Sequence, residues 1–236
     1  MKSIAGLEAV QQTIQVLRVT AQVARQQRRL RRAFRTMPNP VPWDWAAPRL
    51  MPLLSGPQFD DPDLPIVRVT SELGPTIEFG LDLGGVFATV DRRVAERWEC
   101  SPEQLTERGL ANLMDRAAKI APDQVVAGVM SGRTIRVLRD EPAWASSILL
   151  DLSSIHRLFG VHDQILAAPT TGCLVSLPID TPTRIAAEIA VDFEGPLTSL
   201  FLDPFVMEEG TLLWAGDALG DDLDDDSADD AEVWTS

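Results

Sequence analysis

The sequence predicts an α+β protein with antiparallel sheets and interspersed helices, preceded by a long N-terminal helix and followed by a disordered acidic tail. Short alternating runs of apolar residues occur in pairs that are separated by single helical stretches. Residues 217–236 contain nine acidic and no basic residues, with too little apolar surface to offset the entropy of ordering. We therefore expect four segments: a basic amphipathic helix (1–37), a proline-rich arm (38–65), a globular domain (66–216) and the tail (217–236).

The N-terminal helix is predicted over residues 4–35, because neither glycine nor proline interrupts the chain between Leu7 and Arg35. Its apolar residues recur every three or four positions, as in a short coiled-coil heptad pattern: Leu7, Val10, Ile14, Leu17, Ala21 and Ala24. Such a helix is stabilised mainly by packing of its apolar face. It should therefore contact its own domain, a second copy or a dedicated docking partner.

An arginine cluster follows on the same predicted helix: Arg25, Arg28, Arg29, Arg31, Arg32 and Arg35. Arginines at this density can neutralise nucleic-acid phosphates or anionic lipid headgroups. However, residues 1–37 carry a net charge of +7 within a chain whose net charge is -14, so the remainder would be repelled by either polyanion. We expect a protein partner or a second copy of the chain, with a membrane surface, nucleic acid and a merely solvated face as alternatives.

The proline-rich arm contains eight prolines, each of which fixes φ and removes a backbone donor, so regular structure is not expected there. The arm also contains Trp43, Trp45, Leu53 and other large apolar residues. These are too apolar for a free linker. We expect the arm to lie in an ordered form on the globular domain.

The globular domain should contain three helices, at residues 101–120, 144–159 and 183–193. Ser101 begins the first with a capping signature, Ser-Pro-Glu-Gln, and Gly160 ends the second. Alternating apolar residues and turn signals predict strands at 66–69, 76–81, 86–90, 124–129, 134–138, 164–168 and 173–177, and residues 211–214 are expected to be the final ordered element. Strand pairs between single helices favour an antiparallel sheet over a doubly wound nucleotide-binding fold.

No catalytic, cofactor-binding or metal-binding residue is predicted. His156 and His162 are the only histidines, and their spacing across Gly160 is unsuited to a metal site on one helix. The aspartates of the tail lack the glycine and closing glutamate of a calcium-binding loop. Cys100 and Cys173 are expected to be reduced, buried and unreactive.

A cytoplasmic location is expected. The N-terminus lacks the apolar core and cleavage site of a secretory signal, and no window approaches the roughly eighteen apolar residues of a membrane span. The arginine-rich helix also suits a mitochondrial transit peptide superficially, but it is rich in glutamine and nearly free of serine. A transit peptide is the minor alternative.

The stretch of residues 101–214 resembles the bacterial YtpQ-like proteins of unknown function. The matching motifs are Ser-Pro-Glu-Gln-Leu at 101–105, Leu-Ala-Asn-Leu at 110–113, Ala-Ser-Ser-Ile-Leu-Leu at 145–150, Ile-Leu-Ala-Ala-Pro at 165–169, Leu-Val at 174–175 and Pro-Leu-Thr-Ser-Leu-Phe at 196–201. The resemblance implies an α+β domain and no particular activity. It covers about half of the chain and leaves out the basic helix, the arm and the tail.

These observations favour a noncatalytic interaction protein, an adaptor or chaperone-like protein that docks or oligomerises through its basic helix. The predicted contact residues are Leu7, Val10, Ile14, Leu17, Arg25, Arg28, Arg29, Arg31, Arg32 and Arg35. One alternative is an enzyme whose site converges only in three dimensions, for example from Asp151, His156 and His162. The other is a nucleic-acid or membrane-surface accessory protein.

Overall fold

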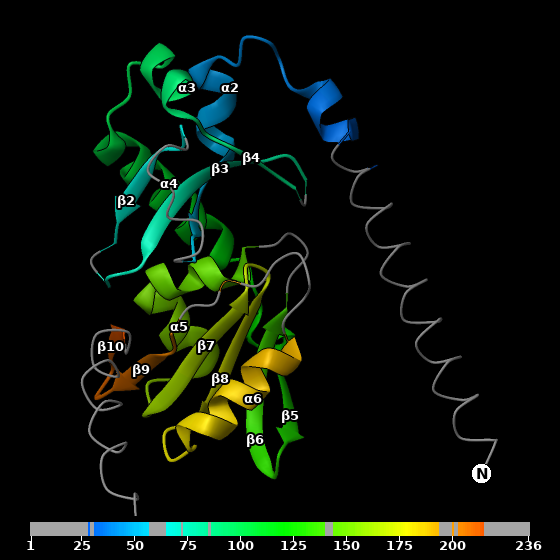
Figure 1. The fold of residues 1–236 in the computed structure, drawn as a ribbon, viewed down its shortest axis with the longest axis vertical. Helices are drawn as coiled ribbons and strands as arrows, with labels where there is room; N and C mark the ends of the chain where they lie inside the picture. Colours follow the sequence, from blue (N-terminus) through cyan, green and yellow to red (C-terminus); the bar gives the residue numbers. More distant parts are fainter. Residues whose placement is uncertain are drawn as a thin grey trace, which may run out of the picture.

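A computed structural model describes residues 28, 31–56, 65–71, 73–84, 86–139, 144–193, 200 and 203–214. These residues form two antiparallel sheets with helices around them, which agrees with the predicted α+β class (Figure 1). Most of the N-terminal helix and the whole acidic tail lie outside the described residues. The length of the N-terminal helix and the disorder of the acidic tail therefore stay predictions.

The first sheet has four strands, with β3 (Thr76–Asp82) at its centre. β1 (Leu50–Leu54) pairs along one side of β3, while β2 (Arg68–Thr70) and β4 (Phe87–Thr89) pair with its first and second halves. The short helices α2 (Trp43–Ala46) and α3 (Arg92–Arg97) lie beside this sheet (Figure 1). Buried residues of this sheet and its neighbouring helices form one hydrophobic core, which we call the four-strand core. Its members are Ala46, Leu50, Val67, Ile77, Phe79, Leu81, Ala88, Val90, Ala95, Trp98 and Leu105.

The second sheet has six strands in the order β10-β9-β7-β8-β6-β5, and all of its pairs are antiparallel. The strands are β5 (Val126–Met130), β6 (Arg133–Arg139), β7 (Gln164–Thr170), β8 (Cys173–Pro178), β9 (Phe205–Glu208) and β10 (Thr211–Trp214). Helix α6 (Thr183–Phe193) covers one face through Ala186 and Ile189. The other face packs on the 3-10 helix η4 (Ala145–Leu150) and on α5 (Leu152–Phe159). The buried residues between them form a second hydrophobic core, which we call the large core and which includes Ile148, Ile155, Phe159, Leu166, Leu174 and Phe205.

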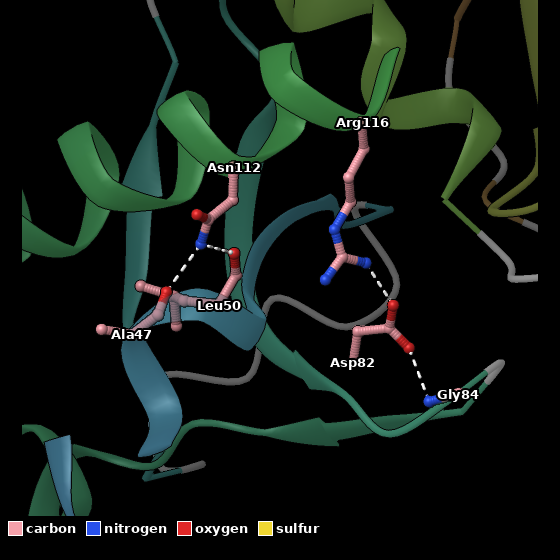
Figure 2. A network of polar contacts seen from close by, with 6 residues as sticks. All are labelled: Ala47, Leu50, Asp82, Gly84, Asn112 and Arg116. Atoms are coloured by element: carbon pink, nitrogen blue, oxygen red, sulfur yellow. Dashed lines mark hydrogen bonds and ion pairs between the residues drawn. The ribbon is translucent and has the colours of Figure 1, made fainter. Parts of the chain in front are cut away.

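Helix α4 (Pro102–Ala117) lies against β1 and so joins the two sheets. Asn112 of α4 is buried, and its side-chain amide donates hydrogen bonds to the backbone carbonyls of Ala47 at 2.7 Å and Leu50 at 2.8 Å (Figure 2). One turn earlier, a Cβ added to Gly109 would lie 3.3 Å from Cδ of Pro52. A side chain at position 109 would therefore make a tighter contact with the strand than most Cβ atoms make.

Charged side chains fix the ends of these helices. Arg116, near the end of α4, forms an ion pair with Asp82 at the end of β3, and Asp82 also accepts the Gly84 N–H at 2.8 Å (Figure 2). Arg157 of α5 donates to the carbonyls of Ala117 and Ile120, both at 2.6 Å, at the C-terminus of α4. A cationic donor such as Arg157 at the C-terminus of a helix binds the last carbonyls and complements the helix dipole.

The helix at residues 101–120 was predicted nearly to its boundaries. Ser101 and Gln104 form the reciprocal capping box, and α4 ends at Ala117. The helix at residues 144–159 is instead divided at Asp151 into η4 and α5. Asp151 causes the division because it serves as the N-cap of α5, where its carboxylate accepts the N–H of Ser154.

Two further predictions need correction. No regular structure was expected in the proline-rich arm, yet α2 and β1 both lie within residues 38–65. Proline is tolerated in an edge strand such as β1, where its missing N–H need not interrupt the ladder, and Pro52 pairs in register with Phe79. The sequence also failed to predict β9, a short strand that pairs with β7 and β10.

Replacing Asn112 with Ala should destabilise the protein, because the buried Leu50 carbonyl loses this donor, while the half-buried Ala47 carbonyl keeps the Arg108 Nε–H at 3.1 Å. We expect the free energy of unfolding to fall by about 1 to 3 kcal/mol, the cost of one buried acceptor left unpaired. Urea unfolding monitored by circular dichroism measures the change as a lower midpoint at constant slope. The matched control is Glu107→Ala on the exposed side of α4, which should shift stability by less than about 0.5 kcal/mol; equal effects of the two variants would contradict the role of Asn112.

Candidate functional site

The described part of the predicted basic helix covers residues 28 and 31–36, all of which are helical. Four of the six clustered arginines lie in it, and all four are exposed: Arg28, Arg31, Arg32 and Arg35. Positions three and four apart on a helix share one side, so these residues form a continuous cationic surface. The other predicted contact residues lie outside the described part of the chain: Leu7, Val10, Ile14, Leu17, Arg25 and Arg29.

The residue that follows this helix end contacts the first sheet's core, because Met37 packs against the four-strand core. Ala33, within the helix, is buried. The Thr36 hydroxyl donates to the Ala33 carbonyl at 2.8 Å and so satisfies a carbonyl at the end of the helix. Phe34, in contrast, is 46% exposed among the arginines. The basic surface therefore contains an apolar side chain that a partner can cover.

A surface groove of about 260 Å³ lies between β2, α3 and the start of α4. Val67, Ala95 and Leu105 give it an apolar floor, and Arg92 and Glu96 of α3 supply charges of both signs. Cys100 also lines it. Arg68, another lining residue, forms an ion pair with Glu78 at 3.0 Å. The groove can hold a small apolar group with a polar end, but it contains no paired acid and base.

The two thiols are poorly suited to nucleophilic catalysis. Burial raises the pKa of the Cys100 thiol, whose Sγ lies 3.4 Å from the Trp98 carbonyl oxygen. Burial also raises the pKa of Cys173 in β8, although a hydrogen bond from Arg139 and its charge act in the opposite direction. The nucleophilic form of cysteine is the thiolate, which a raised pKa makes scarcer at neutral pH.

The structure does not join Asp151, His156 and His162 in a catalytic arrangement. Asp151 accepts the Ser153 hydroxyl at 2.7 Å as part of the α5 cap. His156 Nε2 lies 3.0 Å from the Gly210 carbonyl in the β9–β10 turn, and His162 is exposed. Within the described ranges, no three side chains of His, Cys, Asp or Glu come together as a metal site would need.

Sequence reasoning missed both the groove and the position of β5 at the end of the sheet that the described strands form. The groove combines β2, α3 and α4 residues that are distant in sequence, so no local pattern could reveal it. The sequence contained one weak indication of the position of β5, because residues 126–130 are Val-Ala-Gly-Val-Met and carry no charge. The sequence predicted a strand there but could not show that it would end the sheet.

No family model, curated protein or solved structure matches this chain. The resemblance to the YtpQ-like proteins therefore stays a prediction. Among the helices that the structure describes, none is long and apolar enough to cross a membrane.

The raised thiol pKa values predict slow alkylation of the folded protein. At pH 7.5, iodoacetamide should label Cys100 and Cys173 several-fold more slowly than it labels the urea-unfolded chain, because the folded chain contains less thiolate. The rate should rise as the pH is raised toward these pKa values. Mass spectrometry of both samples gives the rates. A folded-state thiol that reacts as fast as the unfolded control would favour the enzyme alternative.

Proposed function

We propose that this protein is a noncatalytic interaction protein that binds a protein partner through its basic N-terminal helix. The observation that carries the proposal is the exposure of Arg28, Arg31, Arg32 and Arg35 on one helix end. Arginine is suited to protein interfaces because its planar guanidinium binds carboxylates in a bidentate manner and loses little hydration. The exposed Phe34 adds the apolar contact that such interfaces use at their centre.

The charge distribution supports a protein partner over a polyanion. Residues 1–37 carry a charge of +7, and the chain as a whole carries -14. A nucleic acid or an anionic bilayer would attract the helix and repel the rest of the molecule. A protein with a local acidic patch presents no such extended field, so it can approach the arginines without the same repulsion.

The described interior gives less support to an enzyme. Asp151 caps a helix, His156 contacts a turn carbonyl, and the pKa values of both thiols are raised. Catalytic groups need an accessible position and a pKa matched to their reaction. The groove beside α3 is the place to search for a ligand if the enzyme alternative is pursued.

The test compares two matched variants of the full chain. In one, Arg28, Arg31, Arg32 and Arg35 are all replaced by Gln; in the other, all four are replaced by Lys. Gln and Lys have similar helix propensities to Arg, so the helix is preserved while only the first variant loses the charge. Affinity capture with each chain is followed by quantification of bound protein, nucleic acid and lipid. We expect one defined protein to be retained by the unmodified chain, retained more weakly by the Lys variant and lost from the Gln variant.

Other outcomes overturn the proposal. Binding to nucleic acid that falls steeply with salt would identify a nucleic-acid accessory protein, because phosphate contacts release counterions. Retention on phosphatidylserine vesicles without any protein would identify a membrane-surface protein. Equal capture by the Gln variant and the unmodified chain would show that the arginine surface is solvated and has no role in binding.

A further inference from the structure

The exposed arginines of the basic helix lie on one side of it. At 3.6 residues per turn, Arg28, Arg31, Arg32 and Arg35 fall within about 100° of arc around the helix axis. Ala33, which is buried, lies on roughly the opposite side of that axis. The helix therefore directs its buried residue one way and its four exposed arginines the other way, where a negatively charged segment can contact them.

The acidic tail has the composition that this surface can bind. Residues 217–236 contain nine acidic residues and no basic residue, whereas residues 1–37 carry +7. Residues 38–216 carry the remaining -12, so they repel the tail while the basic helix attracts it. Carboxylates and arginines form charge-assisted hydrogen bonds that are often bidentate. The tail and the basic helix are therefore complementary in both charge and hydrogen bonding.

The far part of the tail also offers an apolar group. Trp234 follows Asp229, Asp230 and Glu232 closely in the sequence. On the basic helix, Phe34 is 46% exposed beside the arginines. An indole ring stacks favourably on a phenyl ring or on a guanidinium. Acidic residues followed by a tryptophan thus supply contacts for the arginines and for Phe34 together.

The length of the tail allows it to reach the basic helix of its own chain. β10, after which the tail follows, and the described end of the helix lie on opposite sides of the molecule (Figure 1). A compact domain of this size has a radius of gyration of about 16 Å, and hence a diameter of about 40 Å. Asp229 and Glu232 lie fifteen and eighteen residues beyond Trp214, so an extended chain carries them about 50 to 60 Å from β10. The far part of the tail can therefore span a domain of this size.

We propose that residues 229–234 of the tail bind the arginine surface of the same chain and so compete with outside partners. This inference rests on the proposed function, because it names what regulates the same surface. Tethering gives the tail an effective concentration of about 0.1 to 1 mM at the arginines. The tail already belongs to the molecule, so its binding adds no negative charge, unlike the approach of a free polyanion. A protein partner has to displace the tail before it can bind.

Zero-length cross-linking tests the contact directly. The full chain with Lys at the four arginine positions keeps the charge and supplies amines, which a carbodiimide joins to carboxylates in contact with them. Mass spectrometry of the monomer band should find Asp229, Asp230 or Glu232 joined to these lysines. The yield should fall several-fold in 1 M NaCl, where the screening length is about 3 Å. The exposed Lys119 of α4 is the matched control amine and should be joined to the tail far less often.

Competition with a free tail measures how far the surface is covered. The probe is a fluorescein-labelled peptide of residues 221–236, and its binding is followed by fluorescence anisotropy. Replacing all nine tail acids of the full chain with Asn or Gln should tighten peptide binding about tenfold, because the chain's own tail no longer competes. Exchanging Asp and Glu throughout the tail keeps the charge and should leave peptide binding within about twofold. In the variant with Gln at the four arginines, the same amide replacements should not change the affinity.

Several results would overturn the proposal. These are equal peptide binding by the unmodified and the amide-tail chains, tightening that persists without the arginines, and links to Lys119 as frequent as those to the introduced lysines. Links confined to a dimer band would assign the surface to the tail of a second copy and would also overturn it. Thermal unfolding of each variant checks that its fold is kept. Neither measurement uses an outside partner, so a failure of the proposed function, seen as no captured protein, is distinguished from a failure of the tail contact.

Discussion

The contact between α4 and β1 is the constraint on which the rest of the structure depends. Asn112 donates to the carbonyls of Ala47, just before β1, and of Leu50, its first residue, and Gly109 faces Pro52 of the same strand. β1 then contributes to both interiors, because Leu50 lies in the four-strand core while Met51 and Leu54 lie in the large core. Since buried carbonyls need donors and protein interiors are close-packed, this contact determines how the two sheets meet.

Most of the charged groups near the interior serve this architecture. Arg116 binds Asp82, Arg157 binds the end of α4, and Arg136 donates to the carbonyls of Leu158 and Phe159 at the end of α5. Each of these arginines binds an acceptor at the end of a helix or a strand. Five buried polar side chains of the described residues nevertheless lack a hydrogen-bond partner: Ser71, Trp144, Ser147, Thr181 and Trp214.

The sequence alone determined the features that depend on local chemistry. The capping box at Ser101, the stop at Gly160, the period of the α6 helix and the charge contrast between the chain ends all follow from residues close together in sequence. Tertiary structure decided the features that depend on distant residues. Pro52 lies in a strand because β1 pairs with β3 and packs on α4. A predicted helix is divided at Asp151 because the Asp151 carboxylate caps α5, and β5 is the last strand of its sheet among the described residues. Local propensity contributes little energy compared with burial and backbone pairing, so the packing of distant segments prevails wherever the two conflict.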